Sequence, residues 1–107
     1  MADLKGKTVL VTGASRGIGA AIAKAAADAG AGLIVHASRP GEALEALVKE
    51  RSIPASRVII EDLAAPGAGF RLFEKALAAA PRIDAVANNA GLYAETPLDG
   101  PNNPWTD

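Results

Sequence analysis

The stretch TVLVTGASRGIG, residues 8–19, decides the fold of this chain. Its first part, Thr8–Thr12, is short, apolar and β-branched, which is typical of a buried parallel strand. A glycine-rich turn follows, and an alanine-rich helical pattern then covers Gly17–Ala29 and ends before Gly30. This geometry suits a nucleotide pyrophosphate, because glycines let the backbone approach the phosphates and the start of the helix offers free N–H groups.

Strand and helix patterns alternate along most of the chain. After the first helix the sequence predicts strand Leu33–Ala37, helix Glu42–Arg51, strand Val58–Ile60, a helix that begins at Pro66 and ends before Pro81, and strand Ile83–Asn88. In the last of these helices, Phe70, Phe73 and Leu77 share one face. Such alternation implies right-handed crossovers and a parallel sheet, and therefore an α/β fold.

The composition is that of one globular domain or a piece of one. The chain has 107 residues, of which 50% are apolar and 21% are charged, and its formal net charge is −1. This balance gives no support for a nucleic-acid partner or an anionic membrane surface. The absence of cysteine excludes disulfides and thiolate chemistry, and a single histidine argues against a metal site. With no basic leader and no long apolar stretch, the expected location is the cytoplasm.

Three motifs in this order resemble the short-chain dehydrogenase/reductase family, in its compact form. Thr12–Gly19 has the spacing Thr-Gly-x-x-x-Gly-x-Gly, and Asn88–Gly91 reads Asn-Asn-Ala-Gly at the end of the fourth strand. Asp62 and Leu63 end the third strand, where that family carries an acidic residue beside the adenine. The resemblance spans nearly the whole chain, from Lys5 to Trp105.

The resemblance implies an oxidoreductase that transfers hydride between a nicotinamide cofactor and a carbonyl or alcohol substrate. The expected architecture is a Rossmann-type doubly wound parallel sheet of about four strands, in the order 3-2-1-4, with three helices. The first two helices should cover one face and the third helix the other. Residues 1–94 would form the dinucleotide-binding half-domain, and residues 95–107 a loop leading to a catalytic half.

Each residue of the glycine loop has an expected role. Gly13 would make the tight turn out of the strand, Gly17 would let the backbone pass under the pyrophosphate, and Gly19 would let the helix pack close to the sheet. The Ile18 amide would donate to the pyrophosphate, and Ser15 would bind a phosphate or the adenosine ribose. The alternative, glycines that merely form a turn, does not explain their spacing.

The ends of the third and fourth strands supply further candidate residues. Asp62 would contact the adenine, although a carboxylate there can also cap a helix or end a strand. Asn88 would be structural, with its amide bonded to the sheet backbone. The cofactor ribose region would be lined by Asn89, Ala90 and Gly91, of which the glycine keeps the cleft floor free of side chains.

The segment after the second strand indicates NADP(H) rather than NAD(H). An NAD-preferring enzyme commonly places a carboxylate about 20 residues beyond the glycine loop, for the ribose 2′-OH. Here that segment contains Ser38 and Arg39, with no acid until Glu42. These two residues, together with Arg16 between the glycines, would bind a 2′-phosphate through charge-assisted hydrogen bonds. Both arginines can alternatively be solvated surface groups.

The catalytic serine, tyrosine and lysine of the family are not found in these residues. The single tyrosine, Tyr93, is followed four residues later by Pro97 instead of lysine, and it is interpreted, like Trp105, as a packing group. His36 is interpreted as a strand packing residue rather than a base. We therefore expect no turnover by this chain alone, and association with itself or with a catalytic half through an open fourth strand. A non-catalytic dinucleotide-binding or sensor module is the main alternative, and a scaffolding protein a weaker one.

Overall fold

The computed structural model describes residues 3–15 and 17–89 and contains one parallel sheet. Its strands are β1 (Thr8–Thr12), β2 (Gly32–Ala37), β3 (Val58–Ile60) and β4 (Ala85–Asn88). Its helices are α1 (Gly17–Asp28), α2 (Glu42–Glu50) and α3 (Ala68–Ala79), with a short 3₁₀ helix at Ala55–Arg57. The strand order is β3-β2-β1-β4 and every pairing is parallel, so the predicted sheet is confirmed.

The turn that ends α1 lies at the glycine that the sequence predicts. Gly30 adopts φ +98°, a left-handed conformation that suits glycine. Its N–H donates to the carbonyl of Ala27, and the N–H of Ala31 donates to the carbonyl of Ala26, both at 3.0 Å. These two bonds satisfy carbonyls that the helix leaves unpaired, and they turn the chain into β2.

Two predicted boundaries differ from the structure by two residues, and the other differences, such as the ends of α1 and α2 and the start of β2, are of one residue. α3 begins at Ala68 rather than at Pro66, because Gly67 adopts φ +74° and only then does the chain become helical. β4 begins at Ala85 rather than at Ile83. Just before it, the N–H of Asp84 donates to the carbonyl of Thr8, and the Asp84 carboxylate accepts the N–H of Thr8, both at 2.8 Å.

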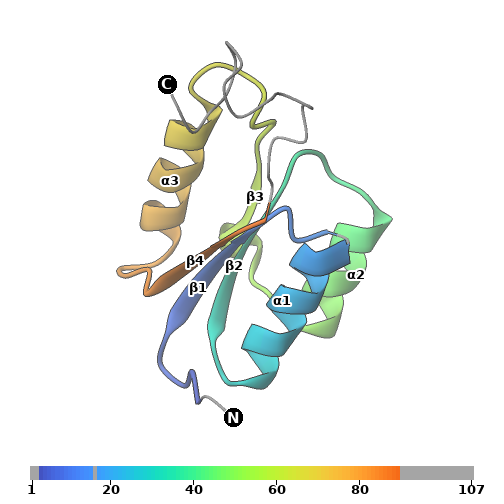
Figure 1. Cartoon of the computed structure of the whole chain (residues 1–107), viewed down its shortest axis with the longest axis vertical. Helices are drawn as coiled ribbons and strands as arrows, with labels where there is room; N and C mark the ends of the chain where they lie inside the picture. The colour runs from blue at the N-terminus through green and yellow to red at the C-terminus, as the bar shows by residue number, and fades with distance from the viewer. Residues whose placement is uncertain (1–2, 16, 90–107) are drawn as a thin grey trace, which may run out of the picture.

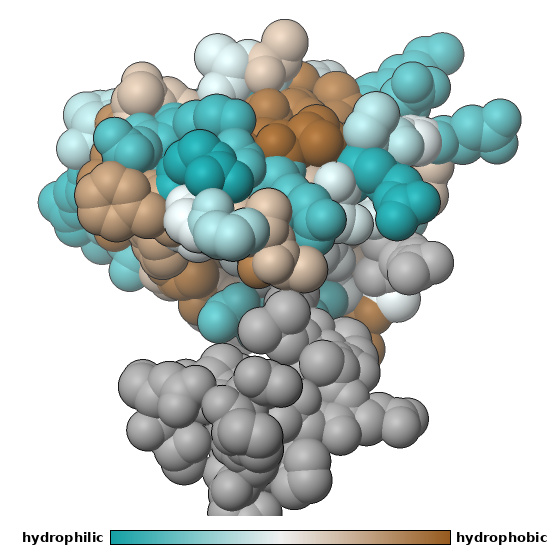
Figure 2. Space-filling model, turned by 90° about the horizontal axis from the view of Figure 1, so that it is seen from above, coloured by the Kyte–Doolittle hydropathy of each residue, from teal (hydrophilic) through white to brown (hydrophobic). Residues whose placement is uncertain are grey.

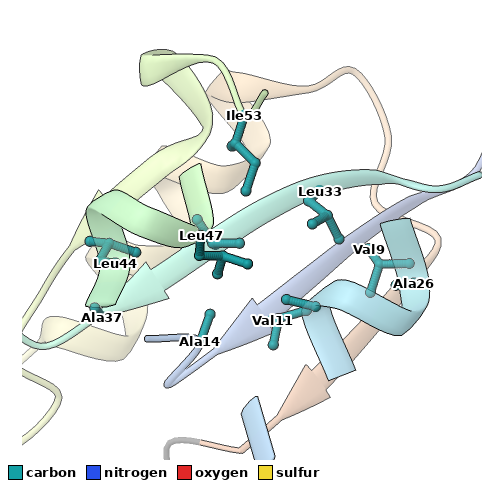
Figure 3. Packing of buried hydrophobic residues seen from close by; sticks show 11 residues of the cluster. Val9, Val11, Ala14, Ala26, Leu33, Ala37, Leu44, Leu47 and Ile53 are labelled. Atoms are coloured by element: carbon teal, nitrogen blue, oxygen red, sulfur yellow. The ribbon is translucent and has the colours of Figure 1, made fainter. Parts of the chain in front are cut away.

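The sheet has an apolar core on each face, and the helices divide between the faces as predicted (Figure 1). α1 and α2 pack on one face, over a cluster that Figure 3 shows. α3 packs on the other face. The alternation of strand side chains explains the division. The α1–α2 side buries Val9, Val11, Leu33 and Val35, and the α3 side buries Leu10, Ile34 and Ile59.

Three large apolar residues of α3 do not face the sheet. Phe70, Phe73 and Leu77 lie on one face, as their spacing predicts, but that face is turned to solvent, with 74%, 46% and 60% of their surfaces exposed. The side packed on the sheet carries the buried residues Ala68, Leu72 and Ala76. Two of these three are alanines, and small side chains allow a helix to lie close to a sheet.

Two carboxylates join elements that are distant in the sequence. The hydrogen bond from Lys75 lowers the pKa of the Glu61 carboxyl, and a bond from Arg71 acts in the same direction against partial desolvation. The N–H of Thr8 lowers the pKa of the Asp84 carboxyl, with Arg82 assisting against desolvation. Both groups therefore favour the folded state when they are ionised.

These lowered pKa values predict an acid-side loss of stability. A carboxylate with a lower pKa in the folded chain contributes fully above its ordinary pKa of about 4, and the contribution is lost as the pH falls through the folded pKa. The free energy of unfolding, measured by urea denaturation, should therefore fall between about pH 5 and pH 3. Glu61→Gln and Asp84→Asn together should flatten this slope. An equal slope in the double variant would contradict the assignment.

Candidate cofactor-binding site

The predicted site residues follow the carboxyl ends of the strands. Because the four strands are parallel, Thr12, Ala37, Ile60 and Asn88 end at one edge of the sheet, towards the top of Figure 1. In the view from above, the described part of the surface mixes apolar patches with polar residues (Figure 2). In open parallel sheets, this edge is where ligands bind.

Gly13 is held from two sides, through its N–H and through its carbonyl. Gly13 adopts φ +60°, and its N–H donates to Nδ1 of His36 at 3.1 Å. The next amide, of Ala14, donates to the main-chain carbonyl of His36 at 2.8 Å. On the other side, the Gly13 carbonyl accepts a 3.3 Å bond from Nδ2 of Asn89. β2 and the residue after β4 therefore fix the turn that leaves β1.

Gly17 and Gly19 are required for different physical reasons. A Cβ at Gly19 would lie 2.0 Å from the Gly13 carbonyl oxygen and 2.6 Å from Nδ2 of Asn89, so only glycine lets α1 pack this close to the sheet. Gly17 adopts φ +59°, and no atom of the described residues lies within 4 Å of a Cβ placed there. The packing role expected for Gly19 is therefore visible, and the backbone at Gly17 is open to a ligand.

The start of α1 suits an anion. The helix is 12 residues long, and its first turn carries no acidic residue. Helix N-termini attract anions through their free N–H groups and the helix dipole. Ile18, in the first turn of α1, is 70% exposed, and Ser15, in the loop before the helix, is half-buried. The open loop and the acid-free helix start fit a pyrophosphate.

The Thr12 hydroxyl joins the ends of β1 and β4, a role that the sequence reasoning missed. It donates to Oδ1 of Asn88 at 3.0 Å and accepts the N–H of Asn89 at 2.9 Å. Asn88 is thus structural, as expected, but its partner is a hydroxyl rather than the sheet backbone. The side-chain amide bonded to backbone belongs to Asn89 instead. The buried, polar end of an otherwise apolar strand is the signal that could have identified Thr12.

Beyond β2, Ser38 and Arg39 are exposed. Within the described residues, neither side chain forms a hydrogen bond or an ion pair, so both are free for a ligand. Asp62 is exposed too, and its carboxylate accepts the N–H of Ala64 at 3.0 Å, which is the local turn-forming role considered as the alternative. Leu63 is half-buried and packs against the core beneath α3.

Some candidate residues lie outside the described residues. They are Arg16, Ala90, Gly91, Tyr93, Trp105 and the tail over 95–107. Within residues 3–15 and 17–89, no three acidic or histidine side chains gather in a way that would hold a metal ion. None of the helices in this part of the chain has the length and apolarity needed to cross a membrane.

The family model described as short chain dehydrogenase matches residues 7–104. The chain belongs to the short-chain dehydrogenase family. Among relatives in this family, versicolorin reductase of Emericella nidulans is 41% identical over 93 residues, which cover 85% of this chain and 35% of the relative. L-rhamnose 1-dehydrogenase (NADP(+)) of Thermoplasma acidophilum is 37% identical over 95 residues, covering 86% of this chain and 37% of the relative.

A solved short-chain dehydrogenase structure gives the same picture of the fold. The 3-oxoacyl (acyl-carrier-protein) reductase of Agrobacterium tumefaciens C58, determined with NADP bound, is 41% identical and matches with a TM-score of 0.69. The match covers 90% of this chain and 40% of that protein. The chain therefore spans less than half the length of these family members.

Proposed function

We propose that this chain forms the NADP(H)-binding part of a short-chain dehydrogenase/reductase that acts on a carbonyl or alcohol substrate. The observation that carries the proposal is the acid-free start of α1, where the position of a Gly17 Cβ is clear of the other described residues. The amides around Gly17, Ile18 and Gly19 would hold the pyrophosphate, and Ser15 would bind a phosphate or the adenosine ribose. When bound, the cofactor supplies or accepts the hydride.

The adenine end and the nicotinamide end would lie along the same edge of the sheet. Asp62 and Leu63 would border the adenine, the latter through its backbone because its side chain packs into the core. The ribose region would be lined by Asn89, Ala90 and Gly91. Residues 1–94 would form the binding half-domain, followed by residues 95–107 as a connecting loop.

The preference for NADP(H) over NAD(H) rests on charge. Arg39 is exposed and unpaired within the described residues, and Ser38 lies beside it. A guanidinium and a hydroxyl bind a 2′-phosphate well, and Arg16 would add a second positive charge. The NADP-bound reductase and the NADP(+)-named relative agree with this choice.

Titration of the chain with NADPH and NADH, followed by the fluorescence of the reduced nicotinamide, tests the proposal. We expect saturable binding of both cofactors with the tighter affinity for NADPH, because only NADPH offers a 2′-phosphate to Arg39. Tighter binding of NADH would overturn the preference. Absence of binding to either cofactor would overturn the cofactor function itself.

We propose further that the chain alone does not catalyse hydride transfer, since a Tyr-x-x-x-Lys motif is not found in residues 1–107. Incubation with NADPH and a panel of ketones should show no turnover above background. A reading frame that carries this motif beyond Asp107 would favour the enzyme over a sensor module.

We also propose that the protein is located in the cytoplasm.

Association of the chain with itself or with a catalytic half also belongs to the proposal, through the β4 edge of the sheet and through the exposed face of α3. Phe70, Phe73 and Leu77 would be covered by a second copy of the chain, because exposed apolar patches of this kind favour association. Light scattering should show a mass that rises with concentration. Phe70→Ser with Phe73→Ser should return a monomer, and a monomeric unaltered chain at high concentration would contradict the idea.

A further inference from the structure

His36 is a buried polar residue in an apolar strand. Only 1% of its surface is exposed, and the other residues of β2 are Gly32 and apolar side chains. Burial of an imidazole costs free energy unless its nitrogens are paired. Both are paired here: Nδ1 lies 3.1 Å from the amide nitrogen of Gly13, and Nε2 lies 2.8 Å from the carbonyl oxygen of Glu61.

These two partners determine the tautomer of the ring. A backbone N–H can only donate, so Nδ1 of His36 must accept and carries no proton. A backbone carbonyl can only accept, so Nε2 must carry the proton and donate it to Glu61. The imidazole is therefore neutral, with its proton on the side of β3.

The ring links the start of the glycine loop to the end of β3. Since the Gly13 amide donates to the imidazole and the Ala14 amide donates to the main-chain carbonyl of His36, this residue binds both amides at the start of the turn. The side chain of Glu61 is itself held by Lys75 at 2.6 Å and Arg71 at 3.1 Å, both on α3. The loop is thus braced through β2 and β3 to α3.

We propose that His36 is a positioning residue for the pyrophosphate loop, which its Nδ1 fixes through the Gly13 amide. The inference rests on the proposed cofactor function. The imidazole holds the peptide that carries the Gly13 N–H, and the next peptide carries the Gly13 carbonyl against which Gly19 and α1 pack. Loss of the Nδ1 bond would let the first peptide turn, which would shift the Gly13 carbonyl and, through Gly19, the first amides of α1 away from the phosphates.

The tautomer can be tested without any substitution. His36 is the single histidine of the chain, so its imidazole signals in a long-range ¹H–¹⁵N NMR correlation are assigned at once. We expect a protonated Nε2, an unprotonated Nδ1 and a scalar coupling across the hydrogen bond from the Gly13 amide to Nδ1. A proton on Nδ1 would overturn the proposal.

Two matched variants separate positioning from simple packing. His36→Asn keeps an acceptor near the position of Nδ1, whereas His36→Gln keeps a donor near the position of Nε2. Each loses one buried hydrogen bond, so both should melt at similarly lower temperatures. NADPH affinity should stay within about threefold of the unaltered chain for His36→Asn and fall roughly tenfold for His36→Gln.

Equal affinities in the two variants would overturn the positioning role. If His36→Gln does not fold, the NMR result on the unaltered chain decides: protonated Nε2 with the Gly13 coupling supports the proposal, and protonated Nδ1 refutes it. If the unaltered chain binds neither NADPH nor NADH, the cofactor function fails and the positioning role fails with it. The NMR experiment does not depend on cofactor binding, so it still shows whether Nδ1 of His36 accepts the Gly13 amide.

Discussion

Gly19→Ala is expected to destabilise the chain by about 3 kcal/mol or more and to remove measurable NADPH binding. The added methyl would lie 2.0 Å from the Gly13 carbonyl oxygen and 2.8 Å from the Gly13 carbonyl carbon. Both atoms are backbone, so no side-chain rotation relieves the clash. α1 must move away from the sheet, and the first amides of the helix move with it. Urea denaturation and cofactor titration measure the two effects.

Gly69→Ala is the matched control for this substitution. It adds the same methyl group to a helix, but among the described residues no atom lies within 4 Å of that position, and the φ of Gly69 is not positive. We expect this variant to gain about 0.5–1 kcal/mol, because alanine loses less backbone entropy than glycine in a helix. If Gly19→Ala is as stable as Gly69→Ala, the result would contradict the close packing of α1 on the turn after β1.

Arg39→Ala is expected to weaken NADPH binding roughly 10- to 100-fold and to leave NADH binding and stability nearly unchanged. The guanidinium is exposed and has no partner within the described residues, so its removal costs the fold little. Its proposed partner is the 2′-phosphate, which NADH lacks. Parallel titrations with the two cofactors measure the ratio directly.

Arg82→Ala is the matched control for Arg39→Ala. It removes the same charge from a side chain that is 73% exposed, at the opposite edge of the sheet, just before β4. Its ion pair with Asp84 lies at that opposite edge, so its loss affects stability rather than the choice of cofactor. We expect no change in the ratio of NADPH to NADH affinity. An equal effect of the two variants would mean that only net charge matters, and the assignment of Arg39 would fail.

Ser38→Asp tests the same site in the other direction. A carboxylate at this position would repel a 2′-phosphate and accept a hydrogen bond from a ribose 2′-OH. The affinity order should therefore reverse in favour of NADH. An unchanged preference for NADPH would place the 2′-phosphate away from the end of β2.

The helices and strands, their order along the chain and the glycine loop followed from the sequence alone. Local patterns determine them: a β-branched run predicts β1, the periodicity of Gly17–Ala29 predicts α1, and the left-handed Gly30 ends it. The parallel pairing of the strands then follows from strand–helix alternation, whereas the strand order 3-2-1-4 was expected from the family resemblance. These signals are carried by contiguous residues, so they can be read without knowing what packs against them.

Only the tertiary structure decided which side chains meet across the sheet. The bond from Gly13 to His36 joins residues 23 positions apart, and those from Thr12 to Asn88 and Asn89 join residues 76 and 77 apart. It also decided that the side of α3 packed on the sheet is the one with Leu72 and Ala76 rather than the one with Phe70 and Phe73. Strand register and helix rotation set these contacts, and both depend on how whole elements pack, which no local pattern encodes.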